Sequence, residues 1–220
     1  MKQINTRIRL TFIDELLGTA AADPDVHTNY IASKAPDVKS LEEEVATVGV
    51  QEVVDSKMTI FSRLPDGTPV LWSYQIRGFF KSACSALRRL SGTRSAKLKA
   101  YKKAIDLTIF VYPDATDPAS RAIPITLPEG GQVGDCQRPL RASTPQGERV
   151  ALANSETMPK GSMIEFDVVT YTEDDMETVR EWLDYGQFNG LGQWRNSGKG
   201  AFVWEELDKD GNVIGGNKAA

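Results

Sequence analysis

The fold is decided by residues 162–206, which read SMIEFDVVTYTEDDMETVREWLDYGQFNGLGQWRNSGKGAFVWEE. Apolar and charged residues alternate along its first ten positions, a pattern that predicts a half-buried strand. Thr172 can cap a helix across Asp174–Leu183, whose apolar residues recur at spacings of three and four. A glycine-rich segment, Gly186–Gly200, then leads into a last predicted strand, Ala201–Glu206.

The preceding sequence supplies the matching half of a sheet. Arg7–Phe12 alternates and predicts the first strand, and the apolar stripe from Ile76 to Leu90 predicts a helix. Ile105–Tyr112 is predicted as a strand with Leu107 and Val111 on one face. The order βαββαβ predicts an α+β, ferredoxin-like (RRM-like) core, with both helices on one face of an antiparallel sheet. RNA-recognition domains use the open face of such a sheet.

Two insertions interrupt this core, and the whole chain is expected to form a single domain. The first, at about 13–57, reads as a polar loop with a short helix at Leu41–Val48. The second, at about 113–161, is rich in Pro, Gly and polar residues and predicts irregular structure. Short strands are expected within it near Ala122–Leu127 and Glu148–Ala153.

The composition is that of a soluble globular protein, with 40% hydrophobic and 25% charged residues in 220. No apolar run approaches the roughly 20 residues that span a bilayer, and the amino terminus shows no signal-peptide core. We therefore expect a cytoplasmic protein without a membrane partner. Two cysteines and one histidine cannot build a zinc site of usual composition, so no metal or cofactor is expected.

Charge is unevenly distributed along the chain. The net charge of −4 argues weakly against a nucleic-acid partner. The basic segment, residues 77–103, nevertheless contains no acid and nine bases: Arg77, Lys81, Arg88, Arg89, Arg94, Lys97, Lys99, Lys102 and Lys103. With Tyr101 among them, these residues fit a groove that follows a nucleic-acid strand. The alternative interpretation is a solvated helix surface.

The glycine-rich loop, Gln187–Gly200, follows a helix and precedes a strand. A dinucleotide-binding loop has the opposite order, and a P-loop would require Ser or Thr after Lys199. Free backbone N–H groups and cations suit phosphates, and an aromatic face suits a base. The loop offers such groups in Gln193, Trp194, Arg195, Asn196 and Lys199. The alternative is a flexible turn.

A loop of this type before the final strand resembles the signature of RAMP proteins of CRISPR effector complexes. Thr6–Gly18 resembles the opening strand of their backbone subunits, and Arg63–Lys81 resembles their hairpin and first core helix. Glu156–Val168 is similar to their Pro-x-Gly turn and third core strand. The resemblance covers roughly half the chain. One departure is Trp72-Ser73-Tyr74-Gln75, which stands where the family has Pro-Gly-Ser-Ser.

The resemblance implies a non-enzymatic subunit that binds single-stranded guide RNA and assembles with copies of itself or with other effector subunits. In that family the start of the first core helix and the glycine-rich loop border the RNA. A helix amino end also favours anions through its dipole. The candidate nucleic-acid-binding residues are therefore Ser73, Gln75, Arg77, Lys81, Arg88, Lys97, Lys99, Lys102, Gln193, Trp194, Arg195, Asn196 and Lys199.

Two alternatives stay open. A phage or mobile element can reuse this fold to bind single-stranded DNA or to interfere with CRISPR machinery, which would suit the acidic overall charge. The other alternative is a RAMP-type endoribonuclease acting through His27, or through Asp23 and Asp25 with a divalent ion. Binding is favoured over catalysis, because a lone histidine in a polar loop is most often a surface residue.

Overall fold

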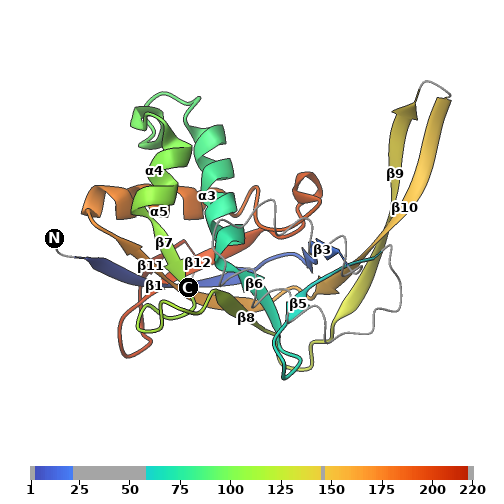
Figure 1. Ribbon diagram of the computed structural model, residues 1–220, viewed down its shortest axis with the longest axis horizontal. Helices are drawn as coiled ribbons and strands as arrows, with labels where there is room; N and C mark the ends of the chain where they lie inside the picture. Colours follow the sequence, from blue (N-terminus) through green and yellow to red (C-terminus); the bar gives the residue numbers. More distant parts are fainter. Residues whose placement is uncertain (1–2, 22–57, 145–146, 218–220) are drawn as a thin grey trace.

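The computed structural model describes residues 3–21, 58–144 and 147–217 (Figure 1). Its core consists of β1 (Ile4–Phe12), α3 (Ser73–Leu87), β7 (Phe110–Tyr112), β11 (Met163–Thr170), α5 (Glu173–Tyr185) and β12 (Phe202–Leu207). These strands lie in the order β12-β1-β11-β7, and each neighbouring pair is antiparallel. The predicted ferredoxin-like βαββαβ core is confirmed.

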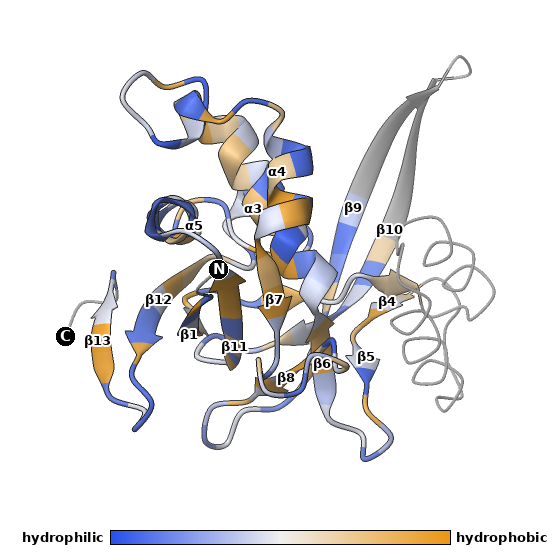
Figure 2. Ribbon diagram, turned by 60° about the vertical axis from the view of Figure 1, so that its left-hand side comes forward, coloured by the Kyte–Doolittle hydropathy of each residue, from blue (hydrophilic) through white to orange (hydrophobic). Residues whose placement is uncertain are grey.

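The helices α3 and α5 cover one face of this sheet (Figure 1). The hydrophobic core lies between these helices and the sheet. Alternation along β1 turns Ile8, Leu10 and Phe12 toward the helices, where each is at most 1% exposed. Phe80 of α3 and Trp182 of α5 pack with their ring centroids 5.5 Å apart. Burial of each such side chain stabilises the fold by roughly 1.5–3 kcal/mol. Figure 2 shows the same pattern as apolar positions on α3 and β7 where they meet.

The prediction of a strand across Ile105–Tyr112 is wrong over its first half. Helix α4 (Tyr101–Thr108) occupies that part of the chain, and β7 begins only at Phe110. Leu107, expected to face inward, is 61% exposed, whereas Ile105 and Ile109 are buried. Buried residues four apart fit a helical turn as well as an alternating strand, so a run this short does not separate the two.

The place of the second core strand is shared by two segments. β7 pairs with one end of β11, and β8 (Ala122–Thr126) pairs with the other end. The sheet continues from β8 to β6 (Pro69–Trp72) and β5 (Ser62–Arg63). The expected strand near Ala122–Leu127 is thus confirmed. On the opposite edge, β13 (Val213–Gly216) pairs with β12.

The second insertion holds a long hairpin that protrudes from the body of the molecule (Figure 1). Its strands are β9 (Gly134–Thr144) and β10 (Gly147–Met158), so the prediction of irregular structure is wrong there. The predicted short strand Glu148–Ala153 is one part of β10. The signal was weak because apolar residues do not alternate regularly with polar ones along Gly134–Thr144, and regular alternation is what marks a half-buried strand in a sequence.

The base of the hairpin belongs to a smaller sheet that lies beside the glycine-rich loop. There β10 pairs with β2 (Leu16–Leu17) and with β4 (Met58–Ile60), and β4 pairs with β3 (Ala20–Ala21). The predicted helix Leu41–Val48 lies outside the described residues. Of the helices that the structure describes, none is long and apolar enough to cross a membrane.

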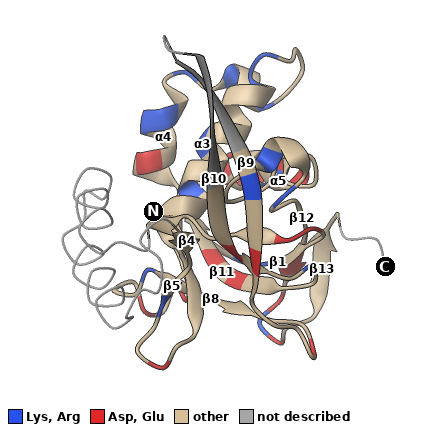
Figure 3. Cartoon of the chain, turned by 90° about the vertical axis from the view of Figure 1, so that its right-hand side faces the viewer, with Lys and Arg blue, Asp and Glu red and all other residues tan. Residues whose placement is uncertain are grey.

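The open face of the central strands carries ion pairs. Arg9 contacts Glu165 at 2.8 Å and Glu205 at 3.8 Å, and Arg7 contacts Glu165 at 3.3 Å. Partial burial alone would raise the pKa of Glu165, but the hydrogen bond and charge of Arg9 bring that pKa below its usual value. RNA-recognition domains stack bases on aromatic residues of this face. Here β1 and β11 present charged residues that neutralise one another instead (Figure 3).

Candidate nucleic-acid interface

The glycine-rich loop closes on itself. The backbone N–H of Leu191 donates to the carbonyl oxygen of Gly200 at 3.0 Å. A Cβ on Gly190 would overlap that same carbonyl, and a Cβ on Gly200, where φ is +73°, would overlap the carbonyl of Leu191. The contact between the two limbs of the loop therefore requires glycine at both positions, independently of any ligand.

Gln193 joins the loop to the smaller sheet. Its Nε2 donates to the carbonyl oxygen of Gly18 at 2.7 Å and to Oγ1 of Thr59 at 3.2 Å. Its Oε1 accepts a hydrogen bond from Nη2 of Arg138 at 2.7 Å. Both ends of this amide, a predicted nucleic-acid contact, are thus engaged within the protein.

Lys199 is held by two carboxylates at the end of β1. Its Nζ lies 3.0 Å from Oδ1 of Asp14 and 2.8 Å from Oε2 of Glu15. The hydrogen bond to Glu15 is the main cause of the raised pKa of Lys199. The charge of this predicted phosphate contact is therefore neutralised inside the protein.

Arg195 connects the loop to α3. It begins the short 3-10 turn Arg195–Ser197, and its Nη1 donates to Oγ of Ser82 at 3.2 Å. No carboxylate of the described residues forms an ion pair with it. Its neighbours Trp194, 39% exposed, and Asn196 are also open to solvent. Arg195 is partly exposed, and these three side chains offer a cation, an aromatic ring and an amide to solvent side by side in the sequence.

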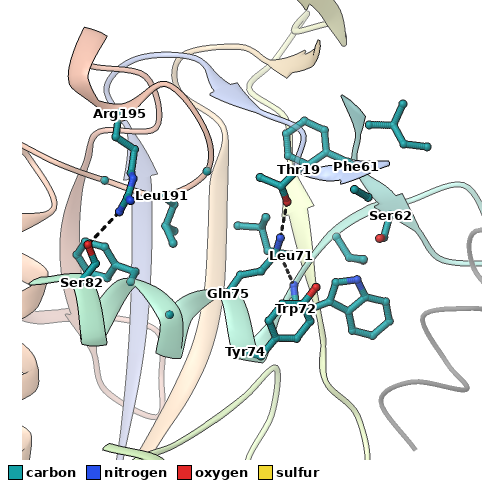
Figure 4. Close-up of a pocket in the computed structure, with 17 residues that line it drawn as sticks. Thr19, Phe61, Ser62, Leu71, Trp72, Tyr74, Gln75, Ser82, Leu191 and Arg195 are labelled. Atoms are coloured by element: carbon teal, nitrogen blue, oxygen red, sulfur yellow. Dashed lines mark hydrogen bonds between the residues drawn. The ribbon is translucent and has the colours of Figure 1, made fainter. Parts of the chain in front are cut away.

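The polar residues at the start of α3 bind other parts of the protein (Figure 4). Ser73 is buried, and its Oγ donates to the carbonyl oxygen of Arg121 at 3.0 Å. Gln75 accepts a hydrogen bond from the backbone N–H of Trp72 at 2.7 Å and donates to Oγ1 of Thr19 at 2.7 Å. Both predicted binding residues thus stabilise the helix start.

The loop and α3 nevertheless share a cavity, as expected for neighbouring parts of one site. It has a volume of about 340 Å³ and lies between the first half of α3, the β5–β6 hairpin and the loop (Figure 4). A second, more open depression of about 680 Å³ lies on the loop itself. Gly192 and Arg195 line both cavities.

The basic segment does not form one patch. Three of its bases are engaged by neighbouring elements: Lys81 contacts Asp106 at 2.6 Å, Arg94 contacts Asp174 at 2.5 Å, and Arg88 lies 5.0 Å above the ring of Tyr101. Helix α3, about 22 Å long at 1.5 Å per residue, separates Arg77 from the exposed cations at its carboxyl end. Those cations are Arg89, Lys97, Lys99, Lys102 and Lys103, and none pairs with an acid in the described ranges.

The candidate catalytic residues His27, Asp23 and Asp25 lie outside the described residues. Within the described part of the chain, no group of three or more His, Cys, Asp or Glu side chains could hold a metal ion.

Sequence reasoning missed Arg138, a buried arginine of β9 that lines the open depression beneath Trp194. It lies in a polar stretch that was predicted to be irregular. No local pattern distinguishes it from an exposed arginine, because its burial depends on contacts with the loop more than fifty residues away.

Comparisons with known proteins bear on the fold. No protein-family model matches the chain, and no curated protein sequence matches it. The chain is similar to a chain in the cryo-EM structure of the Type III-B Cmr-beta bound to cognate target RNA, with a TM-score of 0.51 and 11% identity. The match covers 94% of this chain and 61% of that chain, so this protein spans less than two thirds of its neighbour's length. The likeness is one of fold, and it agrees with the ferredoxin-like core described above.

Proposed function

We propose that this protein binds single-stranded guide RNA as a RAMP-type backbone subunit of an RNA-guided effector. The observation that carries the proposal is the chemistry around the glycine-rich loop. Arg195, Trp194 and Asn196 offer a cation, an aromatic ring and an amide at two adjoining cavities. Among the described residues that line these cavities, none is acidic.

This combination of groups suits a single strand. A guanidinium pairs with phosphate oxygens, and an exposed indole stacks on a base of any sequence. The exposed cations beyond the end of α3 attract a longer strand, although salt screens their field beyond about 10 Å. The open sheet face offers less, because its arginines are already paired with Glu165 and its neighbours.

The fold supports the assignment to an effector. The solved structure of similar fold is that of a Type III-B Cmr-beta complex bound to cognate target RNA. The resemblance of the loop, the first strand and the hairpin to RAMP backbone subunits points in the same direction. Association with copies of itself or with other effector subunits is part of the proposal on the same grounds.

The proposal is tested by the salt dependence of binding to an oligonucleotide labelled with a fluorophore. If about 4–6 phosphates are bound, the logarithm of the association constant K should fall with the logarithm of the salt concentration with a slope of roughly −3 to −4. A slope near zero, or no binding at low salt, contradicts the proposal.

Single-stranded DNA is the competing ligand. The exposed groups of the loop suit phosphates and base faces, which RNA and DNA share. RNA and DNA strands of equal sequence should therefore be compared directly, and preference for RNA is expected of a guide-binding subunit. Tighter binding of DNA favours the alternative of a phage or mobile-element protein.

A further inference from the structure

Arg138 is a buried cation with unused hydrogen-bond donors. Its side chain comes from the base of β9, and the residue is 8% exposed. Nη2 donates to Gln193, but Nε and Nη1 are buried and have no partner. Among the described residues, no carboxylate forms an ion pair with it. An uncompensated buried charge is strongly destabilising, so this arrangement calls for an anion.

The indole of Trp194 covers this guanidinium. The centroid of its ring lies 5.3 Å from Cζ of Arg138, a cation–π contact that compensates only part of the lost solvation. Trp194 itself has φ +54° and ψ +35°, a left-handed backbone conformation that residues other than glycine rarely adopt. A strained residue thus lies directly on an unpaired charge. Strain of this kind persists where it serves a ligand site.

The depression around this contact contains groups for each part of a nucleotide. Arg138 and Arg195 are cations, and Phe188, 73% exposed, adds a second open ring beside Trp194. Asn189 also lines it, with a buried Oδ1 that has no hydrogen-bond partner. A phosphate, a base face and the N–H groups of a base edge would satisfy these residues in turn.

We propose that Arg138 binds the phosphate of one nucleotide of the strand and that Trp194 is the movable cover of this subsite. On binding, the indole leaves the guanidinium and stacks on the base, while phosphate oxygens accept hydrogen bonds from Nε and Nη1. Gln193 keeps the guanidinium in place through Nη2. The proposal rests on the function proposed above. It adds Arg138 as a residue that binds a phosphate and Trp194 as a residue whose side chain moves when the strand binds.

The tryptophans provide a specific signal. Of the four in the chain, Trp72, Trp182 and Trp204 are at most 4% exposed, and only Trp194 is open to solvent. Acrylamide quenching therefore reports mainly on Trp194. Adding unlabelled oligouridylate to the wild-type protein should reduce the quenching, because a stacked base protects the indole.

The decisive variant is Arg138→Met, with Arg94→Met as the matched control, because Arg94 pairs with Asp174 and Glu177 away from the loop. Removal of an unpaired buried charge should leave the unfolding midpoint in urea unchanged or higher, and the affinity for oligouridylate should fall about tenfold or more. The protection of Trp194 should disappear. The control should retain it. A lower midpoint, or unchanged affinity, overturns the proposal, because Arg138 would then be a structural residue.

A second variant tests the cover without touching Arg138. Trp194→Gly removes the indole and the left-handed strain, so the midpoint should not fall. Inorganic pyrophosphate should then compete with oligouridylate more strongly than in the wild-type protein, and adding Arg138→Met should abolish that gain. Equal competition in all three proteins contradicts a covered phosphate subsite. If wild-type protein binds no oligouridylate, the proposed function fails; if Arg138→Met binds as wild type does, only the subsite fails.

Discussion

Nη1 of Arg195 lies 3.2 Å from Oγ of Ser82, and this bond joins the glycine-rich loop to α3 across 113 residues of sequence. The two segments meet because β12 runs antiparallel to β1. The loop that enters β12 therefore lies at the end where β1 leaves the sheet, on the side that α3 covers. The cavity between them has one wall from each half of the chain.

Replacement of Arg195 by alanine should weaken single-strand binding without unfolding the protein. If its guanidinium binds one phosphate, the slope of log K against log salt should become less negative by about 0.7. Anisotropy titrations at several salt concentrations measure this slope. Arg94→Ala is the control, because Arg94 is paired with Asp174 and Glu177 away from the loop. Equal slopes for Arg195→Ala and wild type would remove Arg195 from the interface.

Gly200→Ala should destabilise the protein much more than Gly211→Ala. Both residues have positive φ, +73° and +83°, so both substitutions add backbone strain of roughly 1–2 kcal/mol. Only at Gly200 would the new Cβ also overlap a carbonyl, that of Leu191; at Gly211 nothing lies within 4 Å. Urea denaturation of the two variants measures the difference, and equal losses would show that the loop can open without cost.

The Lys199–Asp14 pair should stabilise the fold only above acidic pH. Burial alone would raise the pKa of Asp14, but the hydrogen bonds from Lys199 and from the backbone N–H of Glu15, with the charges of Lys199 and Lys160, together hold that pKa below its usual 3.8. The contribution of the ionised Asp14 to the free energy of unfolding is therefore complete above about pH 3.8, the usual pKa. This contribution is lost as the pH falls through the lower pKa that Asp14 has in the folded state. Because the side chains are 20% and 41% exposed, the coupling should stay below about 1 kcal/mol.

A double-mutant cycle with Asp14→Asn and Lys199→Met measures this coupling energy in urea at neutral pH and at about pH 2. The coupling is expected at neutral pH and should be absent in acid. A coupling that persists in acid would mean that packing of the Lys199 stem, not its charge, holds the loop.

Glu181→Ala should destabilise the turn that follows α3. The Glu181 carboxylate accepts hydrogen bonds from the backbone N–H of Arg94 at 2.6 Å and of Ser95 at 3.0 Å. Loss of both leaves unpaired donors, at a cost of about 1–3 kcal/mol each where they remain buried. Urea denaturation measures the loss. Glu177→Ala is the control, since its ion pairs are on the surface, and an equal effect would contradict the role of Glu181.

The core was predictable where the sequence carries a regular period. Alternation in Arg7–Phe12 and the three-and-four spacing from Ile76 predicted β1 and α3, because one face of each is buried against the other. The glycine-rich loop was also recognisable before the last strand. The sequence suggested that this loop offers free backbone N–H groups to a phosphate. The structure shows instead that Gly190 and Gly200 are needed for contact between the two limbs of the loop.

The sequence by itself determined the βαββαβ order, since burial of one face leaves a periodic trace in each core element. Only the tertiary structure decided which charges are free. Lys199 and Lys81 are neutralised by acids from other elements, whereas Arg138 is buried under Trp194 with two donors unused. The state of a charge depends on what packs against it across the fold, and such contacts leave no local pattern in the sequence.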